Sequence, residues 1–290
     1  VFIPRGNTPD LATRLQGSGL AAYTHAVATG KASAGHDLST EQAYDIEIPR
    51  LGVLTGEGVN AASYGAHWFF LEQTAGLSFD ALPLDRIENT RLERYNVIVA
   101  PELSRPNDRV SAALKTWVQS GGTLVAVGNG ARNLGAPLAE TKLRSDSSRE
   151  SSEQKVERGL RGRPERELDR WQEQVPGTIL PVRLDAAHPL SFGAGIAGDS
   201  TRLFVLHSGG AVFDPDPAFE TVGHFQNDLG RVSGVISQKN LDRLKQGAWL
   251  AVKRVGRGRV ILFADDPLFR NFWYSAFQPY MSAILIGPKL

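Results

Sequence analysis

Apolar and polar positions alternate regularly along the chain from Arg50 onward. Short apolar runs, such as RLGVLT, YNVIVA and TLVAVG, are separated by longer segments in which apolar residues recur every three or four positions. The first pattern predicts buried strands and the second predicts amphipathic helices. We expect strands at 50–55, 77–84, 95–102 and 123–128, with helices at 61–76 and 107–122. This alternation is typical of a parallel sheet with helices on both faces.

In the second half of the chain the strand-like segments follow one another without long helices. Strands are expected at 177–184, 202–208, 219–225 and 231–237, then a helix at 239–246. A hairpin follows, because the glycines of GRG separate the apolar runs AWLAVKRV and RVILFA. A last amphipathic helix is expected over about 268–286. The predicted fold class is therefore α/β, with a mostly parallel, doubly wound, flavodoxin-like sheet and an added antiparallel β portion.

Two segments depart from this regular pattern. Residues 1–49 predict a connecting α/β piece, with a strand VFIP, a helix at 9–20 and a strand-like YTHAVA, before a domain that spans 50–290. Residues 140–173 hold nine Lys or Arg and nine Asp or Glu, but few large apolar residues. Such a composition buries too little to pack, so we expect a solvated insertion, partly helical or disordered. A docking arm is the alternative.

Composition and charge exclude several classes of function. The formal net charge of +1 gives no bias toward nucleic acid, and no apolar run reaches the ~18 residues of a membrane span. The chain has no cysteine, which removes disulfides, thiolate metal sites and a cysteine nucleophile. It begins with Val, from which we expect a piece of a longer polypeptide.

Local motifs predict no catalytic residue and no metal site. No His begins a His-x-x-Glu or His-x-x-x-His pair, and no Gly-x-Ser-x-Gly elbow occurs. Gly56, Gly58 and Ala61 satisfy the Ala-ended form of the dinucleotide fingerprint, with Asp85 as the acidic residue. The alternative, a sharp bend between strand and helix, is favoured because Asp85 follows a Pro-containing segment and the helix is rich in aromatic residues.

Several ordered segments carry a resemblance to a known family. RLGVLTGEGVNAASYGAHWFFLEQ, YNVIVAPE, LKTWVQSGGTLVAVGNGAR and GRGRVILFADDPLFRNFW resemble a class I glutamine amidotransferase-like domain. More narrowly, they resemble the C-terminal domain that follows the catalytic domain in bacterial zinc carboxypeptidases of the carboxypeptidase A type. FIPRGNTPDLATRL and PGTILPVRLDAAHPLSFG extend the resemblance over most of the chain.

The resemblance implies a non-catalytic accessory domain. Gly128 stands where active amidotransferases have their Cys nucleophile, with Asn129 next to it, and the strand before the expected His leads to Asp265 and Asp266. Glutamine hydrolysis therefore lacks both nucleophile and base. The resemblance also implies an upstream peptidase domain as partner, zinc only in that domain, and a secreted or periplasmic location.

Loops after parallel strands meet at one edge of the sheet, and this predicts a candidate pocket. Its expected residues are Glu57, Asn60, Gly128, Asn129, Arg132, Asp265, Asp266 and Arg270. They would either bind a peptide or small polar ligand or fasten the last helix through an ion pair between Arg270 and a carboxylate, above Trp273. Two further functions stay open, namely a hydrolase that uses the cleft carboxylates and a stand-alone module that binds a small molecule or carbohydrate.

Overall fold

The computed structural model describes residues 10–25, 29–31, 46–144, 156–157, 159–196, 198–199, 201–209, 212–230 and 232–290. The chain divides into two compact units, residues 1–45 and 46–290. The first unit contains α1 (Leu11–Gly17) and a 3-10 helix (Leu20–Tyr23). The expected strand at 1–4 and most of the loop at 31–40 lie outside the described residues.

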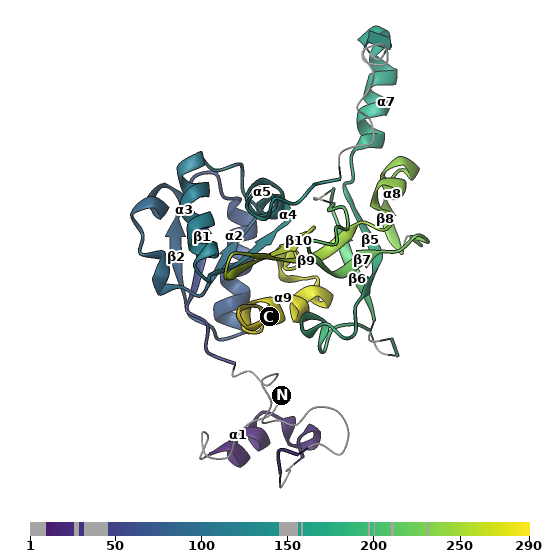
Figure 1. The fold of residues 1–290 in the computed structure, drawn as a ribbon. Helices are drawn as coiled ribbons and strands as arrows, with labels where there is room; N and C mark the ends of the chain where they lie inside the picture. The colour runs from purple at the N-terminus through teal and green to yellow at the C-terminus, as the bar shows by residue number, and fades with distance from the viewer. Residues whose placement is uncertain are drawn as a thin grey trace. The chain divides into compact units, whose positions relative to one another are not determined.

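The second unit contains a mixed sheet of ten strands, parallel on one side and antiparallel on the other (Figure 1). The strands are β1 (Leu51–Thr55), β2 (Phe79–Pro83), β3 (Val97–Ala100), β4 (Thr123–Val127), β5 (Gly177–Leu184), β6 (Arg202–His207), β7 (Glu220–Phe225), β8 (Ser233–Val235), β9 (Ala248–Val255) and β10 (Gly258–Phe263). Their order is β2-β1-β3-β4-β10-β9-β7-β5-β6, and β8 pairs with β5.

The sheet changes from parallel to antiparallel at β10. Strands β2, β1, β3, β4 and β10 are parallel to one another, whereas β9 pairs antiparallel with β10, and β7, β5 and β6 continue the antiparallel pairing. Every residue of β3 and β4 is buried, as their continuous apolar sequences predict for strands covered on both faces. The molecule is thus a mixed α/β protein with a mostly parallel core.

Helices cover both faces of the central strands. Within the described residues, the α-helices of the second unit are α2 (Ala61–Trp68), α3 (Asp108–Gln119), α4 (Gly128–Gly130), α5 (Ala136–Ala139), α7 (Arg163–Glu173), α8 (Gln238–Leu244) and α9 (Phe277–Leu285). Tyr280 of α9 contacts Phe263 of β10 and also Phe70, which follows α2 in the sequence. Gly135 lies against Leu262 of β10. Since Leu262 and Phe263 are neighbours in a strand, α9 and the segment at Gly135 lie on opposite faces (Figure 1).

Shorter helical turns complete the unit. Two π-helical turns continue α2 and α4, over Phe69–Thr74 and Ala131–Gly135. The 3-10 helices are Leu84–Asn89, Leu92–Arg94, Pro189–Ser191, Phe269–Asn271, Tyr274–Ala276 and Gly287–Lys289. Among the described helices, none combines the length and apolar composition that crossing a lipid bilayer requires.

The C-terminal segment corrects one prediction. The expected helix at 268–286 is two 3-10 helices followed by α9. Arg270 and Asn271 have positive φ of 48° and 53°, which no α-helix accommodates. Pro279 lies in the first turn of α9, where its missing N–H leaves no helical bond unmade. The sequence pattern was that of a continuous amphipathic helix, but this proline sets where the helix can begin.

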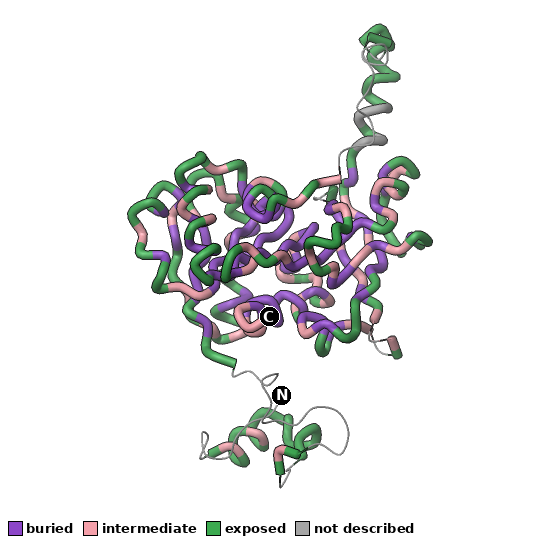
Figure 2. The backbone as a smooth tube through the Cα atoms, in the orientation of Figure 1, coloured by how far each residue is buried: buried purple, intermediate pink, exposed green. Residues whose placement is uncertain are grey.

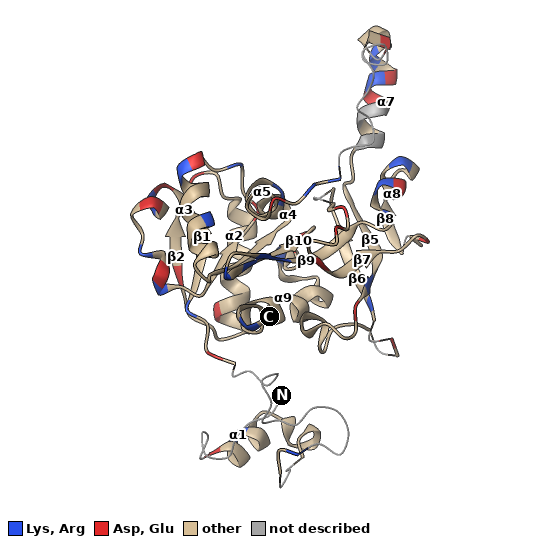
Figure 3. Ribbon diagram, in the orientation of Figure 1, with Lys and Arg blue, Asp and Glu red and all other residues tan. Residues whose placement is uncertain are grey.

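The charged insertion is described in part. Residues 145–155 lie outside the description, and the residues of α7 whose burial is described are exposed (Figure 2). Basic and acidic residues are interspersed along the described elements (Figure 3), in agreement with the formal net charge of +1.

Candidate functional site

The loops after β1, β3 and β4 meet at the carboxyl edge of the parallel strands. They line a cavity of about 540 Å³, which we call the carboxyl-edge cavity. Its lining residues are Gly58, Val59, Asn60, Glu102, Leu103, Ser104, Asn129 and Asn133. Of the expected pocket residues, Asn60 and Asn129 therefore line this cavity.

The turn GEGVN after β1 is tied to the loop after β3. Gly56 and Gly58 have φ of 93° and 87°, values that favour glycine. The backbone N–H of Asn60 donates to the carbonyl of Glu102, and that of Ser104 donates to the carbonyl of Gly58, both at 2.8 Å. The glycine-rich turn thus forms one wall of the carboxyl-edge cavity.

The same turn starts α2 and anchors it to the end of β10. The Oδ1 atom of Asn60 accepts hydrogen bonds from the backbone N–H groups of Ala62 and Ser63, which makes Asn60 an N-cap. The Ser63 hydroxyl donates to Asp266 Oδ2 at 2.7 Å and accepts from the backbone N–H of Glu102 at 3.1 Å. Ser63 therefore joins the loops after β1, β3 and β10.

The Gly128 turn leaves room for the side chain of Glu102. Gly128 has a φ of 49°, and a Cβ added there would lie 2.6 Å from Glu102 Oε1. Glu102 thus fills the space that a side chain at position 128 would need. Glutamine hydrolysis has no nucleophile here, because the expected Cys position is glycine.

The carboxyl group of Glu102 binds a proton more tightly than an ordinary glutamate does. Its burial, together with the charges of Asp266 and Asp265, raises its pKa to about 7. At neutral pH a large fraction of Glu102 is therefore neutral and can donate a hydrogen bond as well as accept one.

The two aspartates after β10 are engaged in buried hydrogen bonds. Asp265 Oδ1 accepts from Nδ1 of the fully buried His207 at 3.0 Å. Asp266 Oδ1 accepts from the backbone N–H of Leu268 at 2.9 Å, in addition to the bond from Ser63. Neither aspartate lines the carboxyl-edge cavity.

A second buried histidine links α2 with α9. His67 Nδ1 lies 2.6 Å from the Tyr280 hydroxyl, and His67 Nε2 lies 3.8 Å from Asp266 Oδ1. Burial lowers the pKa of His67 against the opposing effect of Asp266, and burial and then Asp266 raise that of Tyr280. Both side chains are therefore neutral, and a buried hydrogen bond joins the Tyr280 hydroxyl to His67 Nδ1.

The expected fastening of the last helix by Arg270 is corrected. Glu57, Arg132 and Arg270 are exposed and do not line the carboxyl-edge cavity. Among the described residues, Arg270 forms no ion pair with a carboxylate, and its guanidinium lies 5.4 Å from the Phe269 ring centre. The positive φ of Arg270 turns the chain at this point, and the bonds of Ser63 and His67 hold the segment instead.

Sequence reasoning missed seven polar side chains of this site. They are Ser63, His67, Glu102, Ser104, Asn133, His207 and Tyr280. Two signals were available. Glu102 is the last residue of YNVIVAPE, at the carboxyl end of a buried strand, and Asn60, Ser63 and His67 recur with the spacing of one helix face. The described residues contain no group of three or more His, Asp or Glu that could hold a metal ion.

Comparison with known proteins yields structural neighbours at low identity. A cytoplasmic protein from Salmonella typhimurium is 11% identical with a TM-score of 0.44, covering 82% of this chain and 98% of its own. A ThuA-like protein from Bacteroides uniformis is 13% identical with a TM-score of 0.46, covering 84% and 94%. An exo-β-1,4-mannosidase from an Opitutaceae bacterium is 12% identical with a TM-score of 0.47, covering 82% of this chain and 36% of the mannosidase.

These comparisons correct the expected family. No family model and no curated protein matches the chain. The neighbours are ThuA-like and glycosidase-type structures, not carboxypeptidase domains. The resemblance to the C-terminal domain of a zinc carboxypeptidase, and with it the metallopeptidase relationship, is therefore wrong. The upstream peptidase domain, its zinc and the exported location rested on that resemblance and stay untested predictions.

Proposed function

We propose that the second unit is a non-catalytic binding module that takes a neutral, hydroxyl-rich small molecule, such as a sugar or polyol, in the carboxyl-edge cavity. The observation that carries this proposal is the chemistry of the lining. It combines three amides, one hydroxyl and the carboxyl group of Glu102, and none of its residues is Lys, Arg or His.

Hydroxyl groups both donate and accept, and so do the groups of this lining. Asn129 is exposed and lines the cavity. Asn133 donates from its Nδ2 to the Leu103 carbonyl, which leaves its Oδ1 as an acceptor. Glu102 adds a donor in its neutral form. An anionic ligand would meet no cation in this lining, which favours a neutral one.

The order of the parallel strands supports a ligand site at this place. The order β2-β1-β3-β4-β10 matches the flavodoxin-like arrangement, in which ligands bind between the first and third strands. The carboxyl-edge cavity lies between the loops after β1 and β3. We assign the parallel half to the flavodoxin-like and amidotransferase-like arrangement on this basis, as a fold-level analogy.

The lining favours binding over hydrolysis by carboxylates. A pair of catalytic carboxyl groups has to reach the reacting bond from two sides. Glu102 lines the cavity, but Asp265 and Asp266 are engaged with His207 and Ser63 and do not line it. One carboxyl group alone suits recognition.

Titration of the full chain with neutral sugars and polyols tests the proposal. Galactose, mannose and mannitol serve as probes, with amide NMR shifts and calorimetry as readouts. We expect one of them to shift residues 58–60 and 102–104, and Asn129→Ala to weaken its binding about three- to tenfold by loss of a hydrogen-bonding amide.

Glu57→Gln is the matched control, because Glu57 is exposed on the same turn but does not line the cavity. We expect its affinity for the probe to equal that of the unmodified chain. The proposal fails if no neutral probe binds in a saturable way, or if Asn129→Ala binds as tightly as the control.

A further inference from the structure

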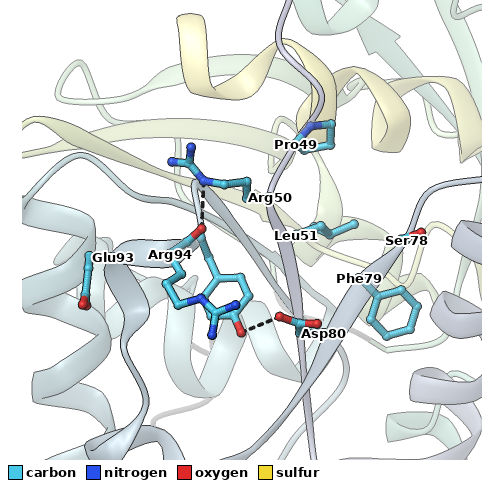
Figure 4. Close-up of a pocket in the computed structure, with 9 residues that line it drawn as sticks. Pro49, Arg50, Leu51, Ser78, Phe79, Asp80, Glu93 and Arg94 are labelled. Atoms are coloured by element: carbon cyan, nitrogen blue, oxygen red, sulfur yellow. Dashed lines mark hydrogen bonds between the residues drawn. The ribbon is translucent and has the colours of Figure 1, made fainter.

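A second cavity lies at the opposite edge of the parallel strands. This amino-edge cavity has a volume of about 560 Å³ (Figure 4). Its lining residues are Pro49, Arg50, Leu51, Ser78, Phe79, Asp80, Glu93, Arg94 and Tyr95. It shares no residue with the carboxyl-edge cavity and lies where β1 and β2 begin.

Arg50 is held in place by bonds that leave the end of its guanidinium available. Its Nε donates to the carbonyl of Arg94 at 2.8 Å, and its backbone N–H donates to Asn96 Oδ1 at 2.8 Å. Among the described residues neither Arg50 nor Arg94 forms an ion pair with a carboxylate. Two exposed cations therefore border one cavity without a close ion pair to a described carboxylate, and the charge of Arg50 acts at longer range on the exposed Glu47.

The Asp80 carboxylate of the lining accepts a hydrogen bond from a neutral donor. The Tyr95 hydroxyl donates to Asp80 Oδ2 at 2.7 Å (Figure 4). Burial and this bond raise the pKa of Tyr95, so Tyr95 stays neutral at neutral pH. The half-buried Phe79 adds an apolar surface to the lining.

We propose that the amino-edge cavity binds a small monocarboxylate, which Arg50 and Arg94 recognise and whose apolar part packs against Phe79. The planar fork of a guanidinium matches the two oxygens of a carboxylate. The charges of Asp80 and Glu93 offset part of the attraction to any anion, and this repulsion disfavours a doubly charged phosphate more than a singly charged carboxylate. Because the Nε bond fixes Arg50 before binding, little side-chain entropy is lost there.

Anion titration of the full chain at constant ionic strength, balanced with chloride, tests this site. Acetate, benzoate and inorganic phosphate are the probes at neutral pH, and amide NMR shifts of residues 78–80 and 93–95 are the readout. We expect saturable binding of acetate, tighter binding of benzoate through Phe79, and weaker binding of phosphate. Arg94→Gln should weaken benzoate binding about tenfold, as for a lost charged hydrogen bond.

Arg109→Gln is the matched control, because Arg109 is an exposed arginine at the start of α3, on the opposite edge of the sheet. We expect this variant to bind benzoate as the unmodified chain does. A benzoate affinity unchanged in Arg94→Gln overturns the site, and so does the lack of any saturable binding over chloride. Phosphate binding that is tighter than acetate binding overturns the assignment to a carboxylate.

Discussion

Glu102 is a residue whose pKa is raised by its position in the fold. Its pKa rises from the ordinary value of 4.5 to about 7, because burial and the aspartates after β10 oppose its negative charge. Between these two pH values the folded chain holds a proton that the unfolded chain has released. The stability that this group contributes is therefore fully present below pH 4.5 and is lost as the pH rises through about 7.

We expect Glu102→Gln to remove this pH dependence. At about pH 8 the variant should unfold with a free energy about 1–2 kcal/mol higher than the unmodified chain, a figure reduced for the partial exposure of Glu102. Near pH 4.5 the two chains should differ little. Urea unfolding at both pH values measures the difference.

The exposed Glu57 on the neighbouring turn supplies the control for this comparison. Glu57→Gln should change the free energy of unfolding equally at both pH values, because an exposed carboxyl group is solvated in either state. If Glu102→Gln retained the pH dependence of the unmodified chain, the raised pKa would have to belong to another group.

Elements far apart in the sequence are joined by the His67–Tyr280 hydrogen bond, whose residues are 213 positions apart. Both side chains are fully buried, so removing one leaves a buried polar atom without a partner. We expect Tyr280→Phe and His67→Leu each to lower the free energy of unfolding by about 1–3 kcal/mol. The double variant should lose less than the sum of the single losses, by about 1 kcal/mol.

Urea unfolding of the four chains of this cycle measures the coupling. Tyr274→Phe is a suitable control, since Tyr274 is 70% exposed and its loss should leave stability within about 0.5 kcal/mol. Strictly additive losses in the double variant would show that α2 and α9 are not coupled through this pair.

A helix or strand can be predicted from the sequence when the residues that make it form are close together in the chain. The expected strand at 177–184 coincides with β5, because strand periodicity is written in neighbouring residues. The last helix was predicted wrongly because a single proline and two residues of positive φ outweigh an apolar pattern. The partners of α2 were missed because helix periodicity marks a face but does not identify what covers it.

At the scale of the whole molecule, the sequence predicted the edge of the sheet at which the cavity lies more reliably than the side chains that line the cavity. Asn60 and Asn129 line the carboxyl-edge cavity because parallel strands bring their following loops together, whatever the loops contain. Glu102 was not predicted to line the cavity because it was interpreted only as the end of a strand. Arg270 was predicted to line the cavity, but it is exposed and lies at a turn of positive φ. The family assignment failed because short apolar strands and glycine turns encode an α/β architecture that many families share.

The distribution of burial over the second unit predicts where proteolysis begins. Residues of β3 and β4 are buried throughout, whereas the described side chains of α7 are exposed, among them Leu168 at 54% and Trp171 at 60%. A helix that buries so little is held by little more than its own hydrogen bonds, so it opens locally at small cost. Trypsin needs an open segment that contains Lys or Arg. Arg161, just before α7, and Arg166, within α7, are both exposed.

We therefore expect the first tryptic cut within residues 46–290 to fall in the insertion at 140–173, and the rest of the unit to persist as associated fragments. Limited digestion followed by intact mass spectrometry and size-exclusion chromatography locates the cut and shows whether the fragments stay together. They should, because β4 and β10, which lie on either side of the insertion in the sequence, are hydrogen-bonded neighbours in the sheet. A first cut inside 50–130 would place the weakest part of the unit among its parallel strands and would contradict this account of its core.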